Sequence, residues 1–387
     1  MSINNLIEFL KEKSNKKFFE ELQKLEDISI NEIQKLTTDH PTKPIKEMLS
    51  LLKLQRKNLK KIPISKELLF TDQGAQQASS WQLSQYHETK FNGFNTVADL
   101  CCGIGIDLMN IARNKLKVIA VDQDADTLKL AEFNCTTQNL QNIEFMPGKA
   151  EEFTATVDAI FIDPDRRSGS SRKISPQDYS PPFSAILELR KICRNMAIKL
   201  SPATDYRKLN LPPDSTLEFI SEDGTLKEIL LCMGELSTEN CKRKAMLLPF
   251  NLTLQNSNLK IEVVEIQKYL FEPDPAIIRA GLVQELGSKL GYNLIDRKLA
   301  LLTGSRYLPS DFGKLYEVEE IMKLDLKKLH KYVRKNEIGE LIIKTRGFSE
   351  SVENFRNKLK LKGKNSIVMF ILRRGDDHII VLSNVVK

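Results

Sequence analysis

The feature that most constrains the fold of this 387-residue chain is a glycine turn between two short apolar runs. Each run carries an aspartate at or next to its end. The first run includes Asp99 and leads into Gly103 and Gly105, and the second ends at Asp122. Between them, apolar residues recur at helical spacing. Strands that alternate with helices of this length predict a parallel α/β sheet, and ligands of such sheets bind beyond the carboxyl ends of the strands.

The residues of the turn narrow the class of ligand. A P-loop would need a Gly-Lys-Ser/Thr ending, which is absent, and a dinucleotide fingerprint would need a small residue where Leu108 stands. An acidic residue before the turn suits an amino group, such as that of the aminopropyl end of S-adenosylmethionine, and glycines let the backbone approach it closely. Asp122 can accept hydrogen bonds from both ribose hydroxyls. An ordinary tight turn is the alternative, and the ordered set of Asp99, two glycines, Asp122 and Asp163 favours the cofactor site.

This stretch resembles the core of the class I S-adenosylmethionine-dependent methyltransferases. Residues 99–105 match the first motif of that family, and Asp122 matches its ribose-binding acid. Residues 148–151 resemble the loop beside the adenine, and residues 163–166 resemble the fourth, catalytic motif. More narrowly, the chain is similar to bacterial methyltransferases with a THUMP-like C-terminal domain, in which DP-x-RR fills the fourth motif. The core resemblance covers about residues 70–250, and the narrower one extends to the C-terminus.

The resemblance implies an α/β fold with a Rossmann-like methyltransferase core, an N-terminal helical subdomain and a small α+β, ferredoxin-like C-terminal domain. It also implies an enzyme whose cofactor is S-adenosyl-L-methionine. The predicted cofactor-binding residues are Asp99, Cys101, Gly103, Gly105, Asp122, Gln123, Lys149, Ala150, Gln76 and Ser80. The predicted catalytic residues are Asp163, Pro164, Asp165 and Arg166.

The chain departs from the family pattern at three positions. Cys101 replaces the glycine that is commonest at the start of the glycine cluster, so a slightly different turn geometry is expected. Asp165 stands where amino-methylating enzymes of the DPPY type carry a second proline, and Arg166 stands where they carry an aromatic ring. That ring normally stacks on a flipped base, so its absence leaves the target atom open.

The segment before the first strand crowds polar side chains beside the sole tryptophan. In related methyltransferases this segment closes over the methionine end of the cofactor, which is why Gln76, Gln77 and Ser80 are assigned to the site. A plain helix with Thr71 or Asp72 as its N-cap is an equally good interpretation of the same residues.

Asp163 is the predicted catalytic acceptor. Methyl transfer is an in-line displacement at carbon, so the protein mainly aligns nucleophile and methyl group, roughly 3–3.5 Å apart. A carboxylate can hold an exocyclic amine so that its lone pair faces the methyl group. Asp-Pro after a strand is also a common turn, but its place in the motif order favours the catalytic interpretation.

Changes in composition divide the chain into four predicted segments. They are an N-terminal helical subdomain (1–65), the methyltransferase core (66–255), a connecting α+β region (256–312) and a basic THUMP-like module (313–387). Strands and helices alternate in the last segment, which indicates a ferredoxin-like module. It contains 17 Lys and Arg against 10 Asp and Glu, an excess of seven that equals the net charge of the whole chain.

Two basic regions are predicted to contact a polyanion such as RNA. In the C-terminal module, Lys344 and Arg346 lie beside an aromatic residue. In the Ser- and Pro-rich loop after the catalytic motif, Arg167 and Arg172 could bind phosphates, and Tyr179 and Phe183 could stack on a base. Each region has the alternative interpretation of a solvated surface.

Composition excludes several other classes of protein. No apolar run approaches 18 residues and the N-terminus is not signal-like, so neither a membrane span nor secretion is predicted. The six cysteines form no CxxC pair, and none of the four histidines stands near a cysteine cluster, so no metal site is predicted. Buried thiols in a reducing cytoplasm are expected.

The sequence therefore predicts a cytoplasmic methyltransferase that modifies a base of RNA, with an exocyclic amine as the favoured acceptor. The alternatives are a DNA or small-molecule methyltransferase, or a cofactor-binding RNA-binding protein without turnover. The intact Asp163-Pro164 pair argues against lost turnover, and the basic module argues against a small substrate.

Overall fold

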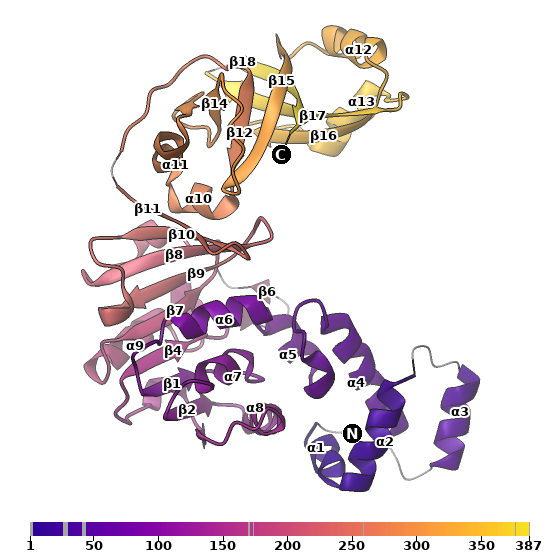
Figure 1. The fold of residues 1–387 in the computed structure, drawn as a ribbon, viewed down its shortest axis with the longest axis vertical. Helices are drawn as coiled ribbons and strands as arrows, with labels where there is room; N and C mark the ends of the chain where they lie inside the picture. Colours follow the sequence, from indigo (N-terminus) through magenta and orange to yellow (C-terminus); the bar gives the residue numbers. More distant parts are fainter. Residues whose placement is uncertain are drawn as a thin grey trace. The chain divides into compact units, whose positions relative to one another are not determined.

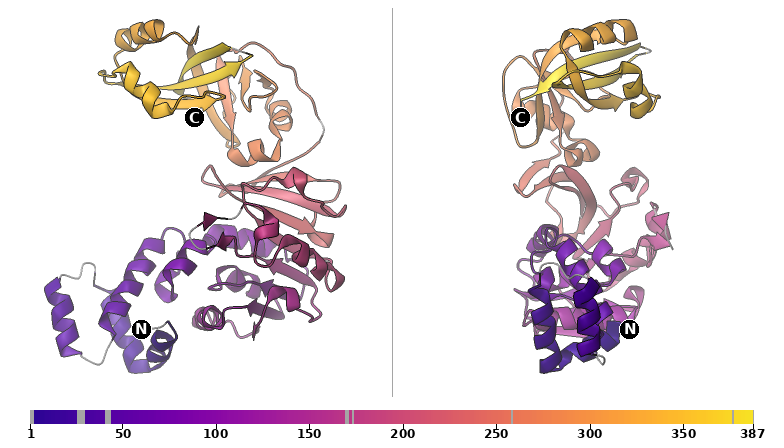
Figure 2. Two further views of the ribbon diagram at one scale, coloured as in Figure 1. Left: turned by 180° about the vertical axis from the view of Figure 1, so that it is seen from behind. Right: turned by 90° about the vertical axis from the view of Figure 1, so that its right-hand side faces the viewer.

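The computed structural model describes residues 3–25, 30–40, 44–168, 171–172, 174–257, 259–375 and 377–386. The chain divides into two compact units (Figures 1 and 2). The first unit contains Met1–Leu217 and Glu228–Asn240, and the second contains Glu218–Lys227 and Cys241–Lys387. Within the described part of the chain, no helix is long and apolar enough to cross a membrane, and no three His, Cys, Asp or Glu side chains are grouped as metal ligands would be.

The N-terminal segment of the first unit is helical, as its apolar spacing predicts. Its helices are α1 (Ile3–Lys11), α2 (Lys13–Gln23), α3 (Ile30–Asp39) and α4 (Ile45–Asn58). Helix α4 buries Met48, Leu51 and Leu52 on one face, which are three and four residues apart and therefore share a side of the helix. Helix α1 contacts a helix of the core, where Asn4 donates a hydrogen bond of 2.6 Å to Asp126.

A parallel sheet forms the centre of the first unit. Its strands lie in the order β3-β2-β1-β4-β7, and β9 joins β7 in the antiparallel sense. These strands are β1 (Thr96–Leu100), β2 (Lys117–Asp122), β3 (Ile143–Pro147), β4 (Ala159–Ile162), β7 (Met196–Leu200) and β9 (Thr225–Met233). The order reverses between β1 and β4, and such a switch point leaves a crevice at the carboxyl ends of the strands.

Helices connect the strands of this sheet and position the residues around the crevice. They are α5 (Asp72–Gln77), α6 (Trp81–Thr89), α7 (Ile106–Ala112), α8 (Ala125–Thr137) and α9 (Phe183–Glu188). All seven residues of α7 are buried, because it follows the glycine turn directly and packs against α6 and α8. The short strands β5 (Arg167–Ser168) and β6 (Ser171–Arg172) pair within the loop after the catalytic motif.

Asp223 and Gly224 form the turn of a hairpin between β8 (Ser215–Glu222) and β9. Both turn residues have positive φ angles, 51° and 69°. Two left-handed residues in succession give a turn whose twist matches that of paired strands, which is why Asp-Gly is a strong hairpin signal.

The second unit is built on a seven-stranded mixed sheet in the order β13-β14-β12-β15-β18-β17-β16. Its strands are β12 (Tyr269–Pro273), β13 (Asn293–Leu294), β14 (Leu302–Gly304), β15 (Gly313–Lys323), β16 (Ile338–Arg346), β17 (Asn365–Arg374) and β18 (Asp377–Val385). The remaining elements are the hairpin of β10 (Arg243–Leu248) and β11 (Leu252–Gln255) and the helices α10 (Pro275–Ala280), α11 (Val283–Leu290), α12 (Leu326–Lys335) and α13 (Val352–Leu359).

The C-terminal strands and helices follow the alternation that the sequence predicts, in the order β15-α12-β16-α13-β17-β18. Alternating residues of β17 and β18 belong to two separate apolar clusters: Met369 and Ile380 to one, Phe370 and Val381 to the other. Strand β12 of the predicted connecting region pairs with β15, with Leu270 opposite Tyr316. Residues of the connecting region and of the basic module therefore contribute to one sheet. The predicted fold class, a Rossmann-like core with N-terminal helices and a smaller C-terminal α+β domain, is confirmed.

Candidate functional site

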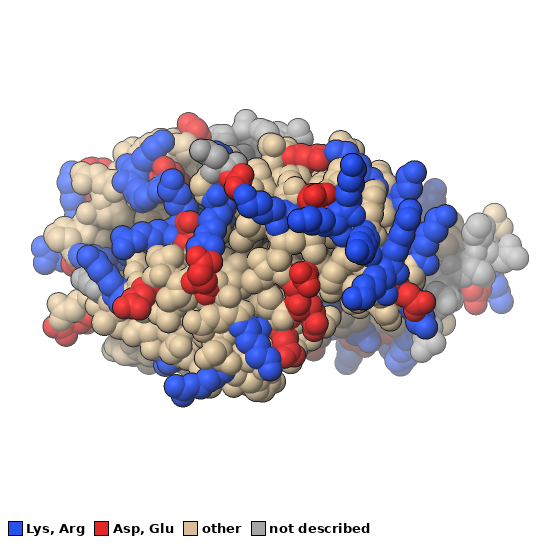
Figure 3. All heavy atoms as spheres, turned by 90° about the horizontal axis from the view of Figure 1, so that it is seen from above, with Lys and Arg blue, Asp and Glu red and all other residues tan. Residues whose placement is uncertain are grey.

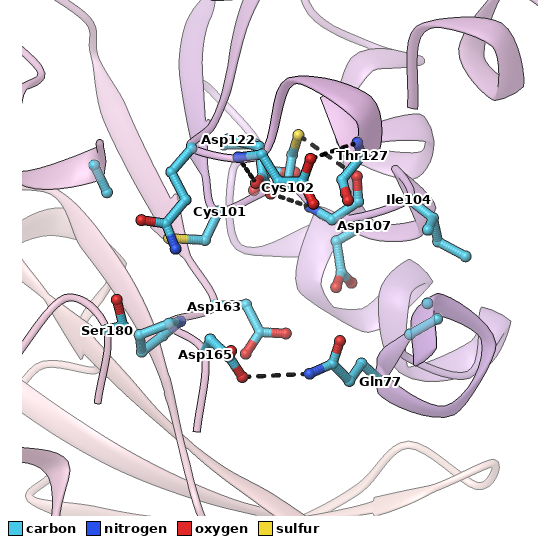
Figure 4. A pocket seen from close by; sticks show the side chains of 18 of the residues that line it. Gln77, Cys101, Cys102, Ile104, Asp107, Asp122, Thr127, Asp163, Asp165 and Ser180 are labelled. Atoms are coloured by element: carbon cyan, nitrogen blue, oxygen red, sulfur yellow. Dashed lines mark hydrogen bonds between the residues drawn. The ribbon is translucent and has the colours of Figure 1, made fainter. Parts of the chain in front are cut away.

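A pocket of about 470 Å³ lies at the carboxyl ends of the core strands (Figure 4). Asp99, Asp122 and Asp163, which stand at strand ends, all contribute to it, because parallel strands end at the same edge of a sheet. The predicted site residues among its lining are Asp99, Cys101, Gly103, Asp122, Gln123, Ala150, Asp163, Pro164, Asp165 and Arg166. All lining residues belong to the first unit.

Asp99 of β1 is a buried carboxylate, with only 1% of its surface exposed. Neither of its side-chain oxygens has a hydrogen-bond partner among the described residues. Burial, together with the charges of Asp107 and Asp163, raises the pKa of Asp99 well above its ordinary value. A buried carboxyl group without partners is costly, and a cation in the pocket would supply the missing interaction.

Asp122 and the glycine turn are bound to one another. The carboxylate of Asp122 accepts hydrogen bonds of 3.0 Å from the backbone N–H groups of Gly103 and Asp124. Burial raises its pKa despite these two hydrogen bonds. Gly103 has a φ of 55°, in the left-handed region that favours glycine. The carboxylate thus holds the turn while lining the pocket.

Cys101 occupies the position where a slightly different turn geometry is expected. Its φ is 66°, so it adopts the left-handed conformation in which glycine has the lowest energy. Its backbone N–H donates to the carbonyl of Val121 on the neighbouring strand, at 2.8 Å. The turn therefore keeps a conformation suited to glycine despite carrying a side chain.

The catalytic-motif residues leave β4 and form one wall of the pocket. The backbone groups of Asp165 exchange two hydrogen bonds with Ser180, at 2.9 and 3.0 Å. The side chain of Gln77 reaches across from α5 and donates to Asp165 at 3.3 Å. Figure 4 shows the carboxyl groups of Asp163, Asp165 and Asp107 around the same part of the pocket. The loop that contains Ser180 and helix α5 therefore both hold this wall in place.

A buried lysine that the sequence interpretation missed lies behind this wall. Lys199 of β7 has 3% of its side chain exposed, and its ammonium donates to Asp163. It also donates to Ser79 Oγ at 2.9 Å and to Asp107 Oδ2 at 3.4 Å. Burial alone would lower the pKa of Lys199, but the charges of Asp107 and Asp163 outweigh it and raise the pKa. The available signal was a lysine inside the apolar run Met196–Leu200.

A buried histidine extends the same set of charges. His87 of α6 is fully buried, with Nδ1 2.8 Å from Asp107 Oδ1 and Nε2 2.6 Å from Glu228 Oε1. Burial would lower its pKa, but the charges of Glu228 and Asp107 outweigh burial and raise it to about 9. Because both ring nitrogens face a carboxylate, both act as donors and the ring is an imidazolium. No sequence motif marks this histidine.

Four predicted cofactor-binding residues do not line the pocket. Ser80 caps α6 by accepting from the backbone N–H of Leu83 at 3.1 Å, and Thr71, one of the two expected N-caps, caps α5 by accepting from Gly74 N–H at 3.0 Å. Lys149 is exposed and pairs with Glu152 at 3.7 Å, Gln76 is exposed, and Gly105 caps α7. Gln77, which the sequence assigns to the same segment, does line the pocket, and so do the neighbouring residues Ser79 and Gly148.

The predicted substrate-binding residues have different outcomes. The side chains of Arg167 and Arg172 lie outside the part of the chain that the structure describes. Lys344 and Arg346 are half-buried and both pair with Glu272 of β12, Arg346 at 3.0 Å. Glu272 is one carboxylate shared by two cations, and the predicted contact of Lys344 and Arg346 with the substrate stays a prediction.

The predicted stacking of Tyr179 and Phe183 on a base is wrong. The two rings are 3% and 2% exposed, and the hydroxyl of Tyr179 accepts from the backbone N–H of Ser201 at 3.1 Å. Both rings belong to the buried core of the first unit, and a close-packed interior leaves no space for a base beside them.

Comparisons with known proteins agree with this geometry. A model of the methyltransferase domain matches residues 97–164, and a model described as THUMP domain-like matches residues 313–384. An uncharacterized S-adenosylmethionine-dependent methyltransferase of Mycobacterium tuberculosis is 29% identical over 316 residues, which are 79% of this chain and 85% of that protein.

Two further relatives differ in how much of the chain they match. The crystal structure of a Porphyromonas gingivalis protein described as a methyltransferase has a TM-score of 0.75 and 22% identity, and the match covers 89% of this chain and 92% of that one. A tRNA (uracil(54)-C(5))-methyltransferase of Schizosaccharomyces pombe is 32% identical over 91 residues, which are 21% of this chain and 17% of that protein. The first similarity spans both units, whereas the second is confined to a short stretch.

Proposed function

We propose that this chain, an S-adenosylmethionine-dependent methyltransferase with a THUMP-like C-terminal domain, transfers the methyl group to a base of RNA. The comparisons support the enzyme class and the cofactor. We propose the nucleic-acid substrate, the exocyclic amine as the acceptor, and the roles of the individual residues. The observation that carries the proposal is an uncompensated basic face on α12 of the second unit.

The residues of the pocket fit the cofactor. When bound, S-adenosylmethionine supplies a methyl group made electrophilic by its sulfonium. Asp99 offers a partnerless buried carboxylate, which suits the ammonium group of the methionine end. Asp122, which stands at the end of β2 and lines the pocket, suits the ribose hydroxyls, and Gln123 and Ala150 line the pocket nearby. The proposed cofactor-binding set therefore consists of Asp99, Cys101, Gly103, Asp122, Gln123, Ala150 and Gln77, all of which line the pocket.

Asp163 is proposed to orient the acceptor amine. One oxygen of its carboxylate accepts from Lys199, and Pro164 restricts the backbone that follows. The other oxygen is available to accept an N–H of the amine, so that the nitrogen lone pair points at the methyl carbon. In the transfer, the new N–C bond forms as the S–C bond breaks, its electron pair stays on sulfur, and the excess proton of the amine passes to solvent. Alignment of this kind lowers the barrier by fixing the reacting atoms before the reaction.

Helix α12 presents a row of cations to solvent. Leu329 and Val333 are buried against the sheet, while Lys327, Lys331 and Arg334 are exposed at three- and four-residue spacing. Lys328 and Lys335 are exposed as well, and within the described residues none of the five cations forms an ion pair. Like charges at this spacing destabilise a helix by about 0.2–0.5 kcal/mol per pair.

A polyanion would relieve this repulsion and release its own counterions. Figure 3 shows many Lys and Arg side chains on one face of the molecule, with fewer Asp and Glu side chains among them. Because Lys344 and Arg346 share the carboxylate of Glu272, the main proposed RNA contact is on α12, whose five cations form no ion pair among the described residues. The partial match to a tRNA methyltransferase supports the same class of substrate.

A DNA methyltransferase is the second candidate, because amines of DNA bases could be held by the same carboxylate. A small-molecule substrate would leave the basic face of α12 without a role. A cofactor-binding protein without turnover would not need Asp163 in the pocket wall.

The experiment is incubation of the purified full chain with radiolabelled S-adenosylmethionine and separate pools of total RNA, DNA and small molecules. We expect label in RNA, and we expect the Asp163→Asn variant to bind the cofactor within a few-fold of the original but to transfer far less label. The exposed Asp178→Asn variant serves as the matched control and should transfer label normally. Label in DNA or small molecules instead of RNA would replace the proposed substrate, and equal transfer by Asp163→Asn would reduce Asp163 to a turn residue.

A further inference from the structure

Five charged side chains of alternating sign run from the pocket wall into the interior of the first unit. They begin at Asp163, continue through Lys199, Asp107 and His87, and end at Glu228. Each consecutive pair is in contact, and the four inner side chains are at most 10% exposed. Only Asp163, at 24%, reaches appreciably toward the pocket opening. The chain of charges is therefore anchored in the interior and ends at the proposed catalytic carboxylate.

Lys199 connects the interior to the pocket. The three donors of its ammonium are all used, on Asp163, Ser79 and Asp107. The hydroxyl of Ser79 also donates to Asp107 at 2.7 Å, which closes the arrangement on that side. Lys199 itself does not line the pocket but lies behind Asp163. Its ammonium can therefore influence the reaction only through the carboxylates that it contacts and through its electric field.

We propose that Lys199 is a positioning residue that fixes the carboxylate of Asp163 and balances its charge, with Asp107, His87 and Glu228 as its buried anchor. This inference rests on the proposed placement of the cofactor in this pocket. It does not depend on which molecule receives the methyl group.

The charge balance matters because the cofactor loses its positive charge in the reaction. Asp99, Asp107 and Asp163 all line the pocket, and the sulfonium would be strongly attracted to three carboxylates. Attraction that is stronger in the ground state than in the transition state raises the barrier. The positive charge of Lys199 weakens that attraction. Its hydrogen bond to Asp163 also keeps the carboxylate oriented toward the methyl acceptor and not toward the sulfonium.

If Lys199 balances these charges, its removal should change the preference of the protein between two ligands. This change can be measured without a methyl acceptor. S-adenosylmethionine and its product S-adenosylhomocysteine differ in the methyl group and in the positive charge on sulfur. Removal of the ammonium in Lys199→Gln should shift the ratio of their dissociation constants toward the charged cofactor. We expect a shift of roughly five-fold or more, as for unit charges several ångströms apart at a protein-like dielectric constant. Calorimetry with both ligands measures the ratio.

Two control variants test whether the shift comes from the charge of Lys199. Lys199→Arg keeps the charge and should leave the ratio close to that of the original protein. Lys191→Gln removes an exposed lysine that pairs only with its neighbour Glu188, and it should leave the ratio unchanged. A purely structural role for Lys199 would weaken both ligands equally, so an unchanged ratio in Lys199→Gln would overturn the proposal.

A second variant covers the case in which Lys199→Gln does not fold. Loss of one member of a buried ion pair is costly, whereas removal of both members is often tolerated. The double variant Lys199→Met with Glu228→Gln removes one buried charge of each sign, keeps the pocket carboxylates Asp107 and Asp163 charged, and still leaves Asp163 without its cation. It should shift the ratio in the same direction, and an unchanged ratio would again overturn the proposal. Failure of the RNA assay with a shifted ratio would refute the proposed substrate and leave this inference standing.

Discussion

Glu228 Oε1 lies 2.6 Å from His87 Nε2, although the two residues are 141 positions apart in the chain. The contact joins the helix before the first strand to the antiparallel strand β9, and Asp107 holds the other ring nitrogen. The ring of Phe161 lies 5.2 Å from the imidazole and excludes water from that side. An imidazolium in these surroundings stabilises the fold only while it keeps its proton.

The stability of the first unit should therefore depend on pH in the alkaline range. The pKa of His87 is about 9 in the folded protein against an ordinary value of 6.5. A raised pKa means that the stabilisation is fully present below pH 6.5 and is lost as the pH rises through about 9. The difference corresponds to an effect on the order of 3 kcal/mol. Urea unfolding followed by the fluorescence of Trp81, the only tryptophan and the first residue of α6, would measure it.

The matched control for this prediction is the double variant His87→Gln with Glu228→Gln, which removes one buried charge of each sign. The other groups that face the ring, Asp107 and the Lys199 behind it, remain in place. We expect the alkaline loss of stability to shrink in this variant. An identical pH dependence in both proteins would show that His87 does not carry the effect.

Cofactor binding should release a proton from Asp99. The pKa of this carboxyl is raised well above its ordinary value by burial and by the neighbouring carboxylates Asp107 and Asp163, with Lys199 acting in the opposite direction. A cationic ammonium favours the ionised form, so the affinity should increase as the pH rises through the raised pKa. Calorimetry in buffers of different ionisation enthalpy counts the protons released. Asp99→Asn should bind more weakly and release none, and equal release by both proteins would contradict the assignment.

Asp122 and Lys149 are both predicted from sequence to contact the cofactor, but only Asp122 lines the pocket. We expect Asp122→Ala to weaken S-adenosylmethionine binding by about 1.5–3 kcal/mol, the range for a hydrogen bond to a charged group. Lys149→Ala should leave the affinity unchanged, because its ammonium pairs with Glu152 at the surface. Calorimetry on both variants measures the difference, and comparable losses would show that the pocket extends to Lys149.

Local sequence patterns were sufficient for most of the fold. The Asp223-Gly224 turn, the run of apolar residues in β4 and the helix-forming residues 326–335 each depend on neighbours close in the chain. The pairing of β12 with β15 could not be predicted, because no local pattern says which strand will lie beside a given edge. The ion pairs of Glu272 with Lys344 and Arg346 could not be predicted either, because they depend on how the strands are arranged in the sheet.

In the candidate site too, the residues that could be predicted are those whose position follows from the local sequence. Asp99, Asp122 and Asp163 stand at strand ends, and the topology of a parallel sheet brings such residues together. The orientation of a side chain on a helix or loop depends on packing, which is why Ser79 lines the pocket and Ser80 caps a helix. Lys199 was missed because a lysine in an apolar strand has meaning only once its buried partners are known.

The proposed RNA contact of α12 should make binding depend on salt. Removal of residues 313–387 would not test this cleanly, since β12 would lose its pairing with β15 and the remaining sheet would be disrupted. Substitution of Lys327, Lys331 and Arg334 by glutamine keeps the buried face of the helix intact.

Each phosphate contact with a single strand contributes roughly −0.7 to the slope of log affinity against log salt. The triple variant should therefore bind single-stranded RNA more weakly and flatten that slope by up to about 2. The matched control replaces Lys13, Lys16 and Lys17, three exposed lysines of α2, and should retain the original slope. Fluorescence anisotropy across a salt series, with RNA and DNA of the same sequence, measures all three proteins. Equal slopes in the two triple variants would show that α12 makes no specific contribution, and tighter binding to DNA would assign the surface to the other nucleic acid.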